Sequence, residues 1–176
     1  MRLFSRRPRV PEEIMVRLVL RDRERIQRHA PTASGGHLVA SDRALHVVPA
    51  VRPNGTRPDG WRVPWEDVAS ARWDEPVLLI TPVPGVRVPP LRASLDDGRD
   101  LAREVEVRVD STVNWYAEHA LTSARGRVRV VARRLPDGSL RFDALPGDGV
   151  DLDAPGVATE VAGLLEAARR QVGAPR

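Results

Sequence analysis

The chain has 176 residues, of which 41% are apolar, 30% charged and 4% aromatic, and it contains no cysteine. This length predicts a single domain that can fold without disulfides or metal. The lack of thiols excludes a disulfide scaffold, a thiolate zinc site, an iron–sulfur cluster and a cysteine nucleophile. No apolar run reaches the roughly 18–20 residues of a membrane span, so we expect a soluble globular domain.

The positive charge is concentrated at the N-terminus. The formal net charge is +4, and residues 1–11 hold four arginines and no acidic residue, so the rest of the chain is neutral overall. We predict a disordered arginine-rich arm over residues 1–10, with a tether to anionic lipid or nucleic acid as the alternative. The pair Arg6-Arg7 lacks the apolar run of a twin-arginine export signal, so we expect a cytoplasmic protein.

A short helix is predicted over residues 11–22. Pro11 suits a first helical turn, Glu12 and Glu13 face the positive end of the helix dipole, and apolar residues recur at helical spacing from position 14 to position 19. A charged stretch follows, within which Ile26 could begin an edge strand.

The middle of the chain is predicted to be β-structure. Residues 38–40 and 44–48 flank a polar break suited to a hairpin turn, and residues 50–60 form a loop rich in Pro and Gly. We expect further strands at 61–65, at the apolar run 77–81 and, more weakly, at 91–95. The four prolines between positions 82 and 90 predict a loop or an edge.

Apolar residues alternate with polar ones from Val105 to His119, which predicts one long strand with a bend or bulge. A short helix over residues 100–106 remains the alternative at its start. Residues 128–132 and 140–145 flank Pro136-Asp137-Gly138 and form a predicted hairpin. An amphipathic helix is predicted over 154–172, because its apolar residues fall on one face.

Two segments resemble a known family. Residues 36–47 (GHLVASDRALHV) and 60–68 (GWRVPWEDV) are similar to consecutive strand elements of bacterial pleckstrin-homology-like (PH-like) and GRAM-like domains. The whole chain resembles actinobacterial proteins with a PH-like body and an arginine-rich strand near the end, here residues 128–134. The resemblance implies a mainly β fold with flanking helices, namely a PH-like antiparallel barrel capped by the C-terminal helix, in a single domain over 11–173.

The family's inositol-phosphate binding does not carry over, because residues 30–36, the matching loop, contain no basic residue. We also find no hydrolase, zinc-protease, Walker or dinucleotide-binding motif. His37, His46 and His119 are the conceivable metal ligands, but structural histidines are commoner. We therefore expect no cofactor, no metal and no catalysis.

The predicted function is a non-catalytic interaction module whose ligand is unknown and whose partner is a protein. The first alternative is weak binding to an anionic membrane or nucleic acid through the arm and the strand between Arg125 and Arg141. A small enzyme with no identifiable nucleophile is the second. The candidate contact residues are the arginines of the arm and those that share a face of the basic strand: Arg6, Arg7, Arg9, Arg127, Arg129 and Arg133.

Overall fold

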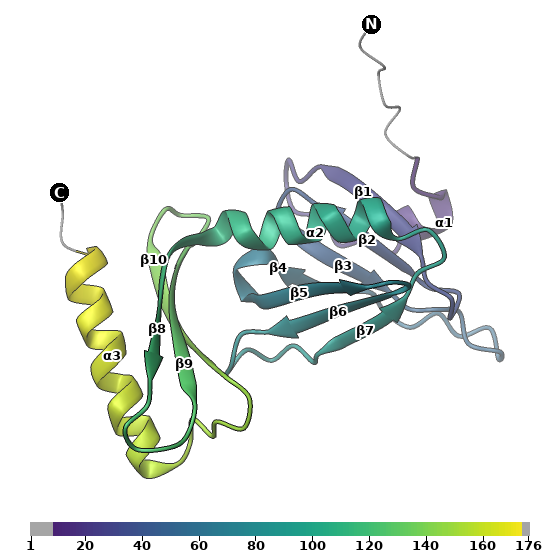
Figure 1. Cartoon of the computed structure of the whole chain (residues 1–176). Helices are drawn as coiled ribbons and strands as arrows, with labels where there is room; N and C mark the ends of the chain where they lie inside the picture. The colour runs from purple at the N-terminus through teal and green to yellow at the C-terminus, as the bar shows by residue number, and fades with distance from the viewer. Residues whose placement is uncertain (1–8, 174–176) are drawn as a thin grey trace, which may run out of the picture. The chain divides into compact units, whose positions relative to one another are not determined.

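The computed structural model describes residues 9–173 (Figure 1). It divides into two compact units. Unit 1 comprises the residues up to Pro82 together with Arg87–Val109, and unit 2 comprises Val83–Val86 together with the residues from Asp110 onward. The single domain over 11–173 stays a prediction from the sequence; within this range the structure has two compact units, each with its own hydrophobic cluster. Residues 1–8 of the predicted arm lie outside the described part.

Unit 1 contains two antiparallel sheets. The first has the order β1 (Ile26–Pro31), β2 (His37–Ser41), β3 (Ala44–Val48) and β4 (Trp61–Pro64). A 3-10 turn at Trp65–Asp67 leads into the second sheet, with the order β5 (Val68–Asp74), β6 (Val77–Pro82) and β7 (Leu91–Ser94). An isolated bridge between Thr32 and Leu95 joins the two sheets at one corner.

The main core of unit 1 lies between these sheets and helix α2 (Arg99–Thr112), which runs along the strands in Figure 1. Leu101, Ala102, Val105 and Val109 of α2 are buried in this core. The strand residues of the core alternate with residues on the outer face of each sheet, as period-two geometry requires; they include Leu38, Ala40, Leu45, Val63, Val68, Leu78, Ile80 and Ala93.

Helix α2 corrects the prediction of one long strand over 105–119. The helix continues to Thr112, and only Val113–Ala120 form a strand, β8. Val105 and Val109 are four residues apart, a spacing that places two residues on one face of a strand and also on one face of a helix. Val107 lies between them and is 56% exposed. In a strand it would lie on the same side as Val105 and Val109, so its exposure agrees with a helix.

The predicted N-terminal helix is shorter than expected. Helix α1 spans only Glu12–Met15, and the chain then continues without regular structure to β1. Ile14 is buried with Val10 against the outer face of the first sheet, whereas Val16 and Val19 are exposed. Arg17 holds this segment in place, because its Nη2 donates to the carbonyl oxygens of Pro49 at 2.7 Å and Pro58 at 2.8 Å.

Unit 2 is a three-stranded antiparallel sheet with a helix on one face. The strand order is β10 (Leu140–Pro146), β9 (Arg127–Arg134), β8, and the helix is α3 (Pro155–Gly173). Figure 1 shows α3 alongside these strands. Val157 and Val161 of α3 pack with Leu121 and Val128, while Leu164 and Leu165 are only partly buried.

The structure confirms a mainly β fold with flanking helices, including the C-terminal helix. The described strands form three separate sheets and no closed barrel. The C-terminal helix was expected to cap the predicted barrel. The structure instead shows α3 packed on β9 and β10, and the helix that packs in the core of unit 1 is α2. Among the described residues, no helix is both long and apolar enough to cross a membrane.

Candidate functional site

The second sheet of unit 1 ends in an open edge. Strand β7 pairs with β6 on one side only and is the last strand of its sheet. Leu91 and Ala93 point toward the core, whereas Arg92 and Ser94 are exposed. An exposed sheet edge offers unpaired backbone donors and acceptors to another chain.

A groove of about 470 Å³ lies between this edge and the first sheet. Its apolar lining includes Leu38, Val47, Leu91 and Ala93, and Arg92 is the one arginine or acidic residue among its lining residues. A volume of 300–1,000 Å³ is typical of sites that take a small ligand or a few side chains. The groove is formed by β2, β3, β7 and the turn after β1, so all of it belongs to unit 1.

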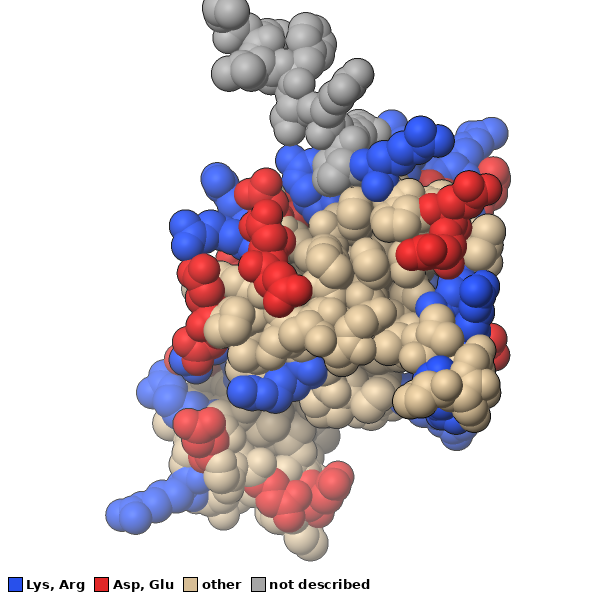
Figure 2. Space-filling view, turned by 90° about the vertical axis from the view of Figure 1, so that its right-hand side faces the viewer, with Lys and Arg blue, Asp and Glu red and all other residues tan. Residues whose placement is uncertain are grey.

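The same unit presents a broad uncharged surface. Figure 2 views the molecule from the side on which α1 and the β3–β4 loop lie in Figure 1. Its central area is free of arginine and acidic side chains, and both signs of charge surround it (Figure 2). Depletion of charge at the centre with a polar rim is the usual composition of a protein–protein interface.

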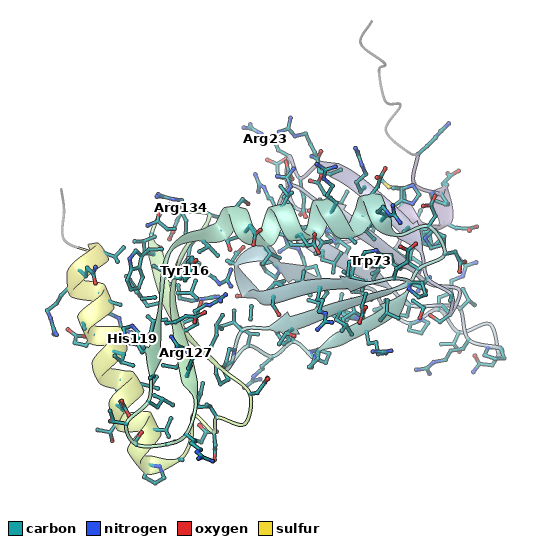
Figure 3. The ribbon with its side chains drawn as sticks, viewed as in Figure 1. Arg23, Trp73, Tyr116, His119, Arg127 and Arg134 are labelled. Carbon is teal, nitrogen blue, oxygen red and sulfur yellow. The ribbon has the colours of Figure 1, made fainter. Side chains whose placement is uncertain are left out.

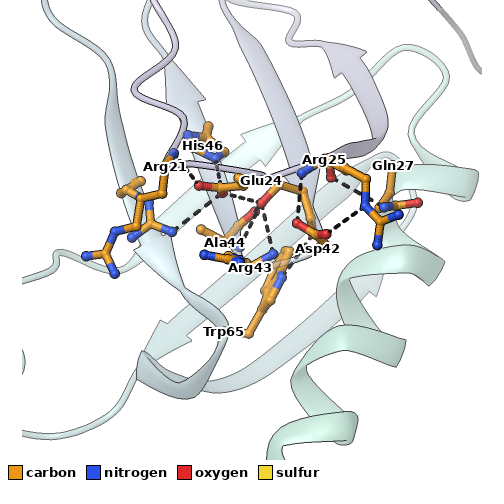
Figure 4. Close-up of polar contacts among 11 residues, drawn as sticks. Arg21, Glu24, Arg25, Gln27, Asp42, Arg43, Ala44, His46 and Trp65 are labelled. Atoms are coloured by element: carbon orange, nitrogen blue, oxygen red, sulfur yellow. Dashed lines mark hydrogen bonds and ion pairs between the residues drawn. The ribbon is translucent and has the colours of Figure 1, made fainter. Parts of the chain in front are cut away.

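A buried carboxylate network lies under the N-terminal segment (Figure 4). The Glu24 side chain is fully buried, and its Oε1 accepts a hydrogen bond from Ser41 Oγ at 2.5 Å and faces His46 Nε2 at 2.8 Å. Arg62 Nη2 lies 3.5 Å from the same oxygen, and the backbone N–H of Arg21 donates to Oε2 at 2.9 Å. These contacts join the segment before β1 to β2, β3 and β4.

The network holds Glu24 ionised. Burial alone would raise its pKa, but hydrogen bonds from Ser41, the Arg21 backbone and His46, with the charge of Arg62, lower it to about 2. Burial lowers the pKa of His46, so the neutral imidazole donates from Nε2 to the carboxylate. Ser41 Oγ contacts Glu24 and the Ala44 carbonyl, not the imidazole, so these three residues lack the geometry of a serine activated by histidine. We interpret the network as structural.

Three of the four histidines of the chain lie on this outer face of the first sheet. His46 pairs across the sheet with Val39 and Arg62, and Val39 also pairs with His29. The rings of His29 and His37 stack with centroids 6.0 Å apart. Burial lowers the pKa of both, and the charge of His37 lowers the pKa of His29 further. No cluster of three or more metal-ligating residues occurs in the described range 9–173.

The predicted basic residues fall into three groups. Arg6 and Arg7 lie outside the described residues, and Arg9 is exposed. Arg127 and Arg129 are exposed on β9, and both pair with Glu118, at 3.5 and 2.7 Å. Arg129 also lies over the Tyr116 ring; Figure 3 labels Arg127 and Tyr116 in unit 2.

Arg133 has the same strand parity as Arg127 and Arg129 but is buried, 1% exposed. It donates to Thr112 Oγ1 at 2.7 Å and lies 3.7 Å from the Asp143 carboxylate. The structure therefore does not bring Arg127, Arg129 and Arg133 together as one exposed cationic face. Strand periodicity predicts on which side of the sheet a side chain lies, but it does not predict whether that side chain is buried or exposed there.

The groove at β7 could not be located from the sequence. Residues 91–95 were predicted only as a weak strand, and nothing local to them indicates which strands they pair with. The Pro89-Pro90 pair just before β7 is the one local signal, because prolines are tolerated at sheet edges and strand starts.

Comparison of the chain with protein-family models, with curated proteins and with solved structures found no match.

Proposed function

We propose that this chain is a non-catalytic interaction module that binds a protein partner through unit 1. The single observation that carries the proposal is the groove beside the open edge of β7, in a unit that has a broad uncharged surface with charges at its margin. A surface of this composition favours a partner that buries apolar area and satisfies backbone groups, as proteins do.

The PH-like fold is part of the same proposal, assigned to residues 26–112 instead of to the whole chain. The family resemblance implies about seven antiparallel strands followed by one amphipathic helix, and residues 26–112 contain seven strands followed by a helix that packs in the core. The helix in that position is α2, and β8–β10 with α3 form an additional unit. PH-like folds carry many different functions, so the fold alone favours no ligand.

The arrangement of charges in unit 2 supports a protein partner over a polyanion. Arg127 and Arg129 share Glu118, and Arg141 lies 3.0 Å from the Asp143 carboxylate that also faces Arg133. A phosphate backbone would have to displace these carboxylates, whereas a polyanion-binding surface normally presents uncompensated cations.

Affinity capture followed by reconstitution tests the proposal. The tagged full-length chain is incubated with extract of its source cells at 50 and 500 mM salt, and each captured protein is purified and titrated back by calorimetry. We expect a saturable protein complex whose affinity changes less than about tenfold between the two salt concentrations. Binding to duplex DNA or anionic vesicles alone, lost at the higher salt, would contradict a protein-binding role.

A further inference from the structure

We propose that an extended segment of the partner protein adds to β7 as a fourth strand of the second sheet, with an aliphatic side chain in the groove. This inference rests on the proposed function and specifies its site and ligand class. It is carried by three features of β7: its backbone orientation, the chemistry of the groove and the identity of its exposed residues.

The register of β6 and β7 shows which backbone groups of β7 are available. Leu95 N–H donates to the Pro76 carbonyl at 2.9 Å, so Leu95 occupies a hydrogen-bonded position opposite the start of β6. Paired residues in an antiparallel ladder alternate between hydrogen-bonded and non-hydrogen-bonded positions. Arg92, paired with Leu79, and Ser94, paired with Val77, therefore direct their N–H and C=O groups away from β6.

A contact at the end of β7 supports this orientation. The Ser94 carbonyl accepts a hydrogen bond from Ala33 N–H at 2.8 Å, on the side of β7 opposite to β6. Three further backbone groups point outward from this open edge of β7, away from β6: the N–H and C=O of Arg92 and the N–H of Ser94. They are one acceptor and two donors, which suffice to align about three residues of an added strand.

The groove determines which side chains the added strand would carry. Alternate residues of a strand point to the same side, so one residue of the added segment would face the lining formed by Leu38, Val47 and Leu91. The next residue would lie on the outer side, next to the exposed Arg92. We therefore infer a segment that alternates aliphatic residues with polar ones and has an acidic residue beside Arg92.

A second copy of this chain is a poorer occupant than a peptide. Two β7 strands paired about a two-fold axis centred on Arg92 would place two arginines in one cross-strand pair, and like charges in that position are destabilising. Pro89 and Pro90 immediately precede β7 and prevent the edge from extending. A short edge with a charge at its centre suits a short, complementary segment.

Two substitutions at one position test the proposal. Arg92→Pro removes the outward N–H but leaves the hydrogen bonds of Leu91 and Ala93 to β6, whereas Arg92→Ala removes the side chain and keeps the N–H. Randomised eight-residue peptides are selected by display on the full-length chain, and the best are synthesised for fluorescence anisotropy. We expect alternating aliphatic and polar sequences that bind R92P about tenfold or more weakly, the effect of losing one hydrogen bond.

The matched variant separates backbone from side-chain recognition. R92A should weaken binding by no more than about threefold, because an exposed ion pair contributes little. If R92P binds as well as the wild type, or if R92A loses as much as R92P, strand addition at β7 is overturned. If R92P does not fold, amide exchange on the wild type decides: the Arg92 N–H must become protected when the peptide binds, and an unprotected Arg92 overturns the proposal.

The outcome for the natural partner separates this inference from the proposed function. If a captured partner binds R92P and the wild type equally, the site is elsewhere and the protein-binding function still holds. If no protein rebinds the chain, the proposed function itself fails. A salt-resistant dimer of this chain that R92P disrupts would assign the edge to a second copy and overturn the peptide proposal.

Discussion

His46 Nε2 lies 2.8 Å from the Oε1 of Glu24, and both side chains are buried beneath the N-terminal segment of unit 1. His46 is on β3, whereas Glu24 precedes β1, so the contact joins parts of the chain that are 22 residues apart. A buried carboxylate is tolerated because donors surround it. The stability of unit 1 below pH 5 should therefore depend on the Glu24 carboxylate.

Replacing Glu24 by Gln should change how stability depends on pH. The pKa of Glu24 is lowered from 4.5 to about 2 in the folded chain. A lowered carboxylate pKa contributes stability that is present above the unfolded value and is lost as pH falls toward the folded value. Between pH 5 and pH 3, the free energy of unfolding of the wild type should therefore fall by roughly 2 kcal/mol more than that of E24Q. Urea titrations at the two pH values measure the difference, and parallel losses would contradict the role given to Glu24.

The histidines on the same face predict a second pH dependence, at a higher pH. Burial lowers the pKa of His29 and His37 below 6.5, and the charge of the stacked His37 ring lowers the pKa of His29 further. The folded chain therefore favours the neutral rings, so stability should be complete above pH 6.5 and decrease as pH falls below it. The double variant His29→Phe with His37→Phe should reduce the fall in melting temperature between pH 7.5 and pH 5.5. An unchanged fall would show that these rings do not titrate with folding.

The helical state of residues 105–109 can be tested with one buried and one exposed position. Leu101 is 1% exposed on α2, and Leu101→Ala should lower the free energy of unfolding by about 2–5 kcal/mol. Val107 is exposed, so Val107→Glu should change it by no more than about 0.5 kcal/mol. In a strand, Val107 would share the buried side of Val105 and Val109, and a severe loss in V107E would favour that alternative.

Glu118 is predicted to suppress polyanion binding by unit 2. Its Oε1 accepts from Arg129 at 2.7 Å, and this hydrogen bond lowers the pKa of the carboxyl group, so Glu118 is ionised at neutral pH. Glu118→Gln should release Arg127 and Arg129 and strengthen binding to duplex DNA, with the log–log salt slope steeper by up to about 2. The matched control is E118Q combined with Arg129→Ala, which should reverse most of the gain. Equal slopes for E118Q and the wild type would show that these arginines do not contact phosphate.

Much of the secondary structure of both units could be predicted from local patterns. The hairpin of β2 and β3, the apolar strand β6, the hairpin of β9 and β10 and the helix α3 all lie within a few residues of their predicted bounds. Each combines a clear periodicity with a turn signal, and both are properties of neighbouring residues. Strand β5 was not predicted, because Val68–Asp74 contains only two large apolar residues, Val68 and Trp73, among alanine, serine and charged residues.

The errors arose where tertiary contacts decide the outcome. Val105 and Val109 satisfy both a helical and a strand period, and the core of unit 1 selects the helix. Arg133 has the parity of an exposed residue but is buried beside Asp143. The Glu24 network and the groove beside β7 bring together residues from several strands, so no single stretch of sequence contains their signal.

Hydrogen exchange on the full chain, with and without its captured partner, tests the central claim most directly. If unit 1 binds the partner at the groove, protection should increase in residues 32–38 and 91–94 and remain unchanged in β9. Protection confined to Arg127–Arg134, or none in unit 1 at saturating partner, would contradict the account.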